Sequence, residues 1–412
     1  MFRLRPTTVY LLSQGALALS LTMVFTVMAV YRVQVVGVSP LQLVLIGTVM
    51  EAAYFLLEMP TGIVADVVSR RLSVIIGMFF LGLAALIEGL FPIFGVILLS
   101  QVAWALGYAF TSGATEAWIA DEVGEAAVGR VFLRGTQVRQ IGTLLGTGLS
   151  VALASVRLNL PMLVGGGMVV ALAGLLALVM TEHGFVPQPR EERSTWGQMG
   201  VTLRAGIGAV RGRPLLISLL GISAVAGMAS EGFDRLWQNH LLVGFTFPAL
   251  GSLDPVVWFG IINAGATIIS LVAVEAVTRW LRPRADEAGV RVLFWMYVLL
   301  CASVVAFGLA RQFGLALAAF WSASAMRRAS DPIYSAWLNR QIDSRVRATV
   351  LSMSSQCDAL GQVVGGPIIG LIASGVSISA AMVVTGLSLA PVLLLFRQRP
   401  TGTAVGAAKV EV

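Results

Sequence analysis

The chain has 412 residues, of which 57% are hydrophobic and only 12% are charged, and its formal net charge is +7. A soluble globular domain carries about 25% charged residues, so this composition excludes a soluble fold and predicts a protein that spans a lipid bilayer. Lys409 is the only lysine, which excludes a lysine-containing phosphate loop. The two histidines and two cysteines lack metal-site spacing. We therefore expect no enzyme activity, no metal and no cofactor.

Twelve apolar segments follow one another along the chain, each close to the ~20 residues that a spanning helix needs. They predict an all-α membrane protein with twelve transmembrane helices. In chain order the segments are 9–35, 42–66, 73–92, 95–121, 131–155, 160–181, 215–243, 256–280, 292–310, 313–338, 346–373 and 376–397.

The longest polar segment separates the first six runs from the last six. We therefore expect an N-terminal six-helix bundle (1–181), a cytoplasmic linker (182–214), a C-terminal six-helix bundle (215–397) and a cytoplasmic tail (398–412). The two bundles also resemble each other, because one gap-free register aligns Gly142 with Gly361 and Gly146 with Gly365. This alignment predicts two six-helix pseudo-repeats.

Arginine placement predicts the orientation. Most of the 28 cationic residues fall in alternate connections, whereas the other connections hold only Arg32, Arg157 and Arg311. By the positive-inside rule the cation-rich side is cytoplasmic, which places both termini inside the cell and the protein in the inner (cytoplasmic) membrane. The positive net charge then reflects topology, and we expect no nucleic-acid partner.

A short motif joins the second and third segments: Gly62-Ile-Val-Ala-Asp66-Val-Val-Ser-Arg70-Arg71. It resembles the signature loop of the major facilitator superfamily, although Val67 and Ser69 replace the usual basic residue and glycine. The resemblance implies a monomeric secondary transporter that moves a small molecule between two six-helix halves.

A narrower resemblance concerns drug exporters of the tetracycline- or macrolide-resistance-like type. It rests on Glu58-Met-Pro-Thr-Gly62 and on Ser112-Gly-Ala-Thr-Glu-Ala-Trp-Ile-Ala-Asp121. The fifth segment departs from classical antiporters, because Gly142-Thr-Leu-Leu-Gly146 contains no proline.

The residues of the signature loop also predict a role from their chemistry alone, without the family resemblance. Gly62 lets another helix approach closely, and Asp66 can stabilise the positive N-terminus of a neighbouring helix. Arg70 and Arg71 can pair with a carboxylate such as Asp121. Together these residues predict a cytoplasmic gate that latches the two halves; the alternative is a tight turn with ordinary positive-inside charges.

Three acidic residues lie deep in predicted helices, where a charge costs roughly 2.5–3.5 kcal/mol. Glu51 and Glu58 share one helix face, and the family resemblance implies that Asp358 approaches them. Burial favours the uncharged form of a carboxyl, so we expect these three to couple transport to protons. The alternative is a structural ion pair, with Arg139 or Arg328 as the partner.

A substrate cavity is predicted at the same depth. Its expected lining is Tyr54, Arg139, Arg328, Asp331 and Tyr334. Asp331 precedes a proline, which cannot donate a helix hydrogen bond. Two interpretations follow: the helix is broken there, at a binding site or hinge, or it is only kinked.

Three functions fit these features. The first is a proton-coupled exporter of amphipathic drugs or metabolites, working by alternating access. The second is a metabolite importer or facilitator on the same fold, and the third is a flippase-like protein that handles lipids. Fold alone does not choose among them.

Overall fold

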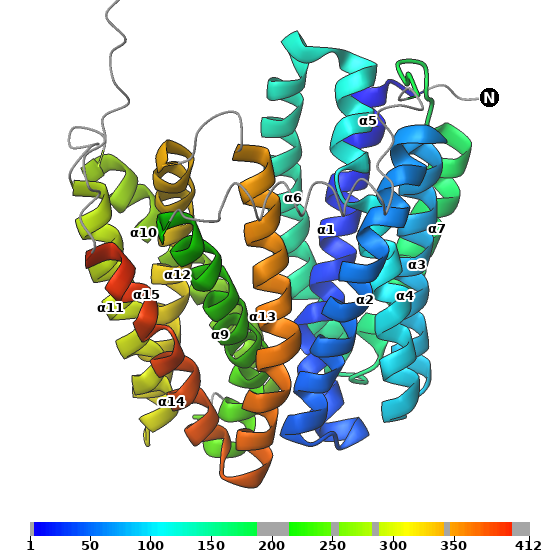
Figure 1. The fold of residues 1–412 in the computed structure, drawn as a ribbon. Helices are drawn as coiled ribbons and strands as arrows, with labels where there is room; N and C mark the ends of the chain where they lie inside the picture. Colours follow the sequence, from blue (N-terminus) through cyan, green and yellow to red (C-terminus); the bar gives the residue numbers. More distant parts are fainter. Residues whose placement is uncertain (1–3, 188–213, 249–254, 282–287, 342–346, 398–412) are drawn as a thin grey trace, which may run out of the picture.

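The structure is a computed structural model that describes residues 4–187, 214–248, 255–281, 288–341 and 347–397. The regular secondary structure in these ranges is helical (Figure 1). The first half contains α1 (Pro6–Tyr31), its continuation η1 (Arg32–Val36), α2 (Pro40–Val67), α3 (Arg70–Leu90), α4 (Phe94–Thr111), α5 (Ala114–Val123), α6 (Glu125–Ala154) and α7 (Leu160–Val179). The second half contains α9 (Pro214–Gly244), α10 (Pro255–Leu281), α11 (Ala288–Leu309), α12 (Phe313–Gln341), α13 (Arg347–Gly375), α14 (Ile378–Ser388) and α15 (Ala390–Arg397).

Each of the twelve predicted segments coincides with a helix or a consecutive pair of helices. Within the described residues, nine helices are long and apolar enough to cross a membrane. The other three segments are α6 and α12, which carry several charged residues, and the broken pair α14–α15. The fold is thus an all-helical, multi-pass membrane architecture with twelve main helical segments.

Local signals explain where several helices begin and end. Ser39 caps α2 by accepting from the Gln42 backbone N–H, and the Gln42 side chain accepts from the Ser39 N–H, which satisfies two orphan donors at once. Ser69 caps α3 with a single bond, in which its Oγ accepts from the Leu72 backbone N–H. Gly113, at φ 70°, divides the fourth segment into α4 and α5, because a left-handed residue cannot continue a helix.

The outer surface fits a lipid environment. In the nine spanning helices, between 22% and 56% of the residues in the most apolar window are buried inside the protein. Large apolar side chains therefore point outward, and Leu99 and Leu178 are 70% and 69% exposed. Water would penalise this surface by roughly 25 cal/mol per Å² of apolar area, whereas lipid does not.

The same helix pairings occur in both halves. In the first half α1 packs on α6 and α7, α3 packs on α4 and α7, and α2 packs on α4. In the second half the corresponding helices pair identically: α9 with α13 and α14, α11 with α12 and α14, and α10 with α12.

Glycines produce the closest of these contacts. A Cβ added at Gly142 on α6 would collide with the Gly15 carbonyl oxygen of α1, and one added at Gly361 on α13 would collide with the Ala224 carbonyl oxygen of α9. The two aligned glycines thus let the first and fifth segments of each half approach backbone to backbone.

The two halves contact each other mainly at one end of the molecule, which we call the joined end. Leu41, at the start of α2, donates its N–H to Ser374 Oγ near the end of α13, at 2.9 Å. Gly370 of α13 packs against Leu41 and Val44. One apolar cluster also crosses the boundary, and its buried members from the first half come from this end: Val27, Val30, Val38, Leu43, Val44, Ile46, Ile97 and Ala154. Figure 1 shows α2 and α13 side by side between the two halves.

Two expected segments fall largely outside the described residues. These are the linker, described only to residue 187 and again from 214, and the tail at 398–412.

Candidate functional site

Three charges meet where the halves join. Arg235 on α9 donates from Nε to Glu231 Oε1 at 3.0 Å, one helical turn away, and its Nη2 lies 3.8 Å from Glu51 Oε1 on α2. The Glu231 side chain is 2% exposed and that of Glu51 is 18% exposed. A Cβ on Gly47 would collide with the side chains of Arg235 and Glu231, so this glycine makes room for the cluster. One guanidinium therefore serves two carboxyl groups from opposite halves.

The second half contains a cavity of about 310 Å³. It is lined by five helices, α9 and α11 to α14, and therefore lies within one half rather than between the two. Its polar and charged lining residues are Ser230, Asp234, Tyr297, Arg327, Ser330, Asp331, Asp358, Gln362 and Thr385.

Charges in this cavity are unequally paired. Arg327 donates from both terminal nitrogens to Asp234, at 2.6 and 2.9 Å, and such bidentate pairs are strong. Asp358 accepts from Gln362 Nε2 at 2.8 Å. In the described part of the chain, neither Asp358 nor Asp331 forms an ion pair with a cation.

The predicted proton-coupling residues occupy different surroundings. Glu51 belongs to the cluster with Arg235 and Glu231 at the boundary between the halves. Its carboxylate is close enough to that of Asp358 for the two charges to interact. The expected packing of the second segment on the eleventh is present as α2 against α13. Glu58 is exposed and accepts a hydrogen bond from Tyr54 Oη at 3.1 Å. The structure thus brings Glu51 towards Asp358 and leaves Glu58 in a more open site.

The arginines considered as ion-pair partners of these acids do not pair with them. The sequence pointed to Arg139 or Arg328 as the structural counter-ion, but both are exposed and neither pairs with Glu51 or Glu58 in the described residues. Arg235 takes that place, because α9 packs beside α2 and α13 at the joined end.

The predicted cavity lining is scattered. Asp331 lines the cavity in the second half. Tyr54 lies in the first half, where its ring packs edge-on against Tyr108 at 5.5 Å. Tyr334 packs against the large apolar cluster.

The interruption considered at Pro332 does not occur. Helix α12 runs from Phe313 to Gln341 with Pro332 inside it, so the missing donor costs one hydrogen bond without ending the helix.

The signature loop forms contacts within the first half. Arg70 pairs with Asp121 and donates to the Ala117 carbonyl at 2.9 Å. Arg71 donates from Nε to the Met180 carbonyl at 2.7 Å, which ties α3 to the end of α7. A Cβ on Gly62 would meet nothing within 4 Å, and Asp66 is partly buried at the end of α2. The expected Arg70–Asp121 pair is thus present, but in this conformation it connects helices of one half.

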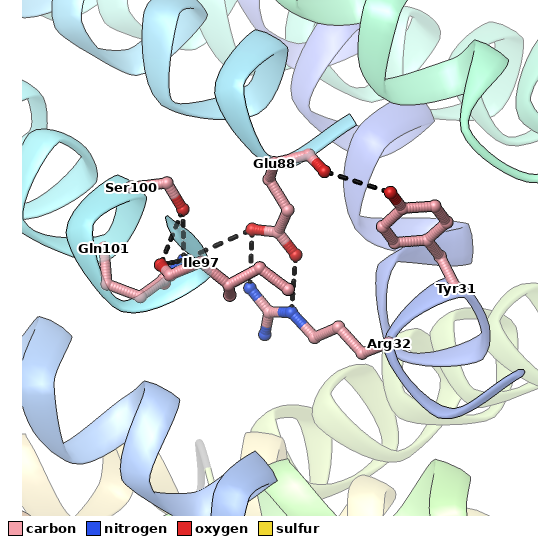
Figure 2. Close-up of polar contacts among 6 residues, drawn as sticks. All are labelled: Tyr31, Arg32, Glu88, Ile97, Ser100 and Gln101. Atoms are coloured by element: carbon pink, nitrogen blue, oxygen red, sulfur yellow. Dashed lines mark hydrogen bonds and ion pairs between the residues drawn. The ribbon is translucent and has the colours of Figure 1, made fainter. Parts of the chain in front are cut away.

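Figure 2 shows a buried network that the sequence reasoning missed. Arg32 in η1 binds Glu88 of α3 through two hydrogen bonds, at 2.6 and 2.9 Å, and their side chains are 6% and 2% exposed. Gln101 of α4 donates to Glu88 at 3.2 Å, and Tyr31 donates to the Glu88 carbonyl at 3.1 Å. Opposite charges at the same ends of neighbouring predicted helices were the available signal; Arg32 was interpreted only as a loop charge.

A model of the Major Facilitator Superfamily matches residues 10–286. The chain belongs to this superfamily. It is 25% identical, over 371 residues covering 86% of each protein, to an uncharacterized MFS-type transporter, YxaM, of Bacillus subtilis (strain 168).

Solved structures share the superfamily's fold at low sequence identity. The nucleoside transporter NupG matches with a TM-score of 0.73 and 13% identity, covering 95% of this chain and 98% of that one. A bacterial homologue of the human lysosomal transporter Spinster, in an inward-facing and unoccupied conformation, matches with a TM-score of 0.70 and 16% identity, covering 95% and 96%. The superfamily match identifies the chain as a multi-pass membrane transporter.

Proposed function

We propose that this superfamily member is a proton-coupled exporter of amphipathic drugs or metabolites that works by alternating access. The observation that carries the proposal is the shared guanidinium of Arg235, which contacts a carboxyl from each half. Proton coupling needs a group whose charge state changes the balance between two conformations, and this cluster lies where the halves meet.

The charges of the cluster favour one proton-carrying acid. Two ionised carboxylates would face one cation in a largely buried place, and a buried charge without a full partner is costly. Glu231 makes the shorter contact with Arg235, and Glu51 makes the longer one. We therefore assign the proton to Glu51, with Asp358 as the neighbouring acid that its charge affects. Glu58 is the weaker candidate because it is exposed and does not belong to the charge cluster at the boundary between the halves.

Coupling then follows from attraction across the boundary. Deprotonated Glu51 attracts Arg235 and stabilises the conformation in which the halves meet at the joined end. Protonation removes that attraction and favours separation there. A carrier that has released its proton is thus held in one conformation until substrate binding supplies the free energy to leave it.

The internal symmetry supports a repeat. The helix pairings recur in the same order in both halves, and the aligned glycines Gly142 and Gly361 make equivalent contacts. We infer twelve spans in two six-helix pseudo-repeats, with bundles at 1–181 and 215–397, a cytoplasmic linker at 182–214 and a cytoplasmic tail at 398–412. A monomer is the simplest functional unit of this arrangement.

The arginine distribution supports the orientation. With both termini cytoplasmic and the protein in the inner membrane, the joined end faces outward and the structure is inward-facing. The likeness to an inward-facing transporter supports the same assignment. Gly62 and Asp66 then lie at the cytoplasmic end. We propose that they form the cytoplasmic gate with Arg70, Arg71 and Asp121, and that the gate closes in the opposite conformation.

Transport in proteoliposomes tests the proposal. Protein reconstituted without other components should move an amphipathic substrate against its gradient when protons flow the other way, and a protonophore should abolish this movement. Each orientation of the pH gradient is applied in turn, because uptake in the same direction as protons would indicate an importer. Equal transport with and without a pH gradient contradicts proton coupling.

A further inference from the structure

We infer that the cavity in the second half binds an organic cation, a small molecule with a positively charged amine and an apolar body. The inference rests on the proposed transport function and adds the chemical class of the substrate. The cavity, at about 310 Å³, lies at the lower end of the range of small-molecule sites, roughly 300–1,000 Å³.

The charge of the lining supplies the first argument. Among the described residues that line the cavity, three carboxyl groups, those of Asp234, Asp331 and Asp358, face one cation, Arg327. Asp234 holds that guanidinium through two hydrogen bonds, so its positive charge is already matched. Asp331 and Asp358 form no close ion pair in the described residues, and the charge of Arg327 acts on both only from a longer distance. Unpaired acids inside a membrane protein are costly, and a bound cation would relieve that cost.

An anionic substrate fits this lining poorly. To use Arg327, an anion would have to displace Asp234 and approach two further carboxyl groups. The neighbouring Arg328 is exposed and does not line the cavity. Outside the cavity, the cationic Arg235 is already engaged by Glu231 and Glu51.

The remaining lining provides a place for an apolar body and a polar anchor. Phe233 and Tyr297 line the cavity, and aromatic rings attract cations through their faces. Thr385 also lines it, is 1% exposed, and its hydroxyl has no hydrogen-bond partner among the described residues. A buried hydroxyl without a partner is unfavourable, so a substrate that reaches it gains a hydrogen bond.

Three probes of one skeleton test the charge preference. Phenylbutylamine, phenylbutanol and phenylbutyrate are cationic, neutral and anionic at neutral pH. Binding of each to the purified full-length protein is measured by titration calorimetry, after subtraction of binding to empty micelles. We expect the amine to bind at least about tenfold more tightly than the other two, a difference of about 1.4 kcal/mol.

Substitutions then locate the site. Asp358→Asn and Asp331→Asn should each weaken binding of the amine about tenfold and leave the alcohol unaffected. Glu275→Gln removes a carboxyl of the exposed pair with Arg279 on α10, outside the cavity, and should leave amine binding unchanged. Equal affinity for the alcohol or the acid, no binding of any probe, or an unchanged affinity in both aspartate variants overturns the inference. The comparison of the three probes uses the unmodified protein, so it tests the preference for a cation even if a variant fails to fold.

Failure of this inference differs from failure of proton coupling. If a pH gradient drives phenylbutyrate or phenylbutanol but the amine does not bind, the cation assignment is wrong and proton-driven transport stands. If the amine binds selectively but a pH gradient never drives its movement, the cavity assignment stands and proton coupling is wrong.

Discussion

The Arg235 guanidinium lies 3.0 Å from Glu231 within its own helix and 3.8 Å from Glu51 across the boundary between the halves. The shorter contact fixes the arginine side chain on α9, while the longer one can be lost without releasing it. A change in the charge of Glu51 therefore acts on the boundary itself, with little effect on the fold of either half.

Glu51→Gln should separate binding from coupling. The amide mimics the protonated acid, so we expect substrate binding within about twofold of the parent protein and loss of uphill transport. Both quantities are measured on the same purified preparation, in detergent and in proteoliposomes. Glu275→Gln serves as the control for loss of one carboxyl. If Glu51→Gln still drives uphill transport with normal pH dependence, Glu51 is not the proton carrier, and that role passes to Glu58 or Asp358.

The buried Arg32–Glu88 pair should be a stability element of the first half. Removing one partner leaves an uncompensated buried charge, which typically costs about 3–5 kcal/mol. We expect Arg32→Gln and Glu88→Gln each to lower the thermal unfolding midpoint clearly, and the double variant to lower it by less than the sum. Strictly additive losses would show that the two side chains act independently.

The glycine contacts allow a matched comparison on one helix. Gly142→Val would force a side chain into the Gly15 backbone, whereas a Cβ at Gly148 meets nothing within 4 Å. Overpacking typically costs about 1–3 kcal/mol, so Gly142→Val should reduce thermal stability while Gly148→Val changes it little. Gly361→Val is expected to behave like Gly142→Val. Equal behaviour of the Gly142 and Gly148 variants would refute close packing of α1 on α6.

Orientation can be read by cysteine accessibility. In a protein whose Cys301 and Cys357 are replaced, Gln34→Cys at the joined end should react with an impermeant thiol reagent in intact cells. Ala126→Cys, in the first turn of α6 at the opposite end, should react only after the membrane is opened. Both positions are exposed. The reverse pattern would invert the proposed topology.

Asp66→Asn tests the cytoplasmic gate. Asp66 lies at the end of α2, which is remote from the joined end, so the substitution should leave the thermal stability of this conformation within about 0.5 kcal/mol. Closure of the cytoplasmic end should weaken, and the transport rate should fall several-fold. A normal transport rate in this variant would show that Asp66 does not contribute to the gate.

The apolar segments predicted the helices well, because each spanning segment must satisfy its own backbone hydrogen bonds inside lipid. The bounds of α2 and α3 differ from expectation by only a few residues. Charge partners were harder to predict, since they depend on which helices become neighbours. Glu51 was recognised as a deep acid, but Arg139 and Arg328 were considered as its ion-pair partners and Arg235 was not. The burial of Glu88 was not predicted, because it lies near a helix end, where a carboxylate is usually hydrated.

The joined end also acts as a fulcrum. Helix α2 has 28 residues, so it extends for about 42 Å at about 1.5 Å per residue. Because its contact with α13 lies near one end, each degree of tilt there displaces the other end by about 0.7 Å. A small change of tilt at this contact therefore becomes a much larger displacement of the opposite end of the helix.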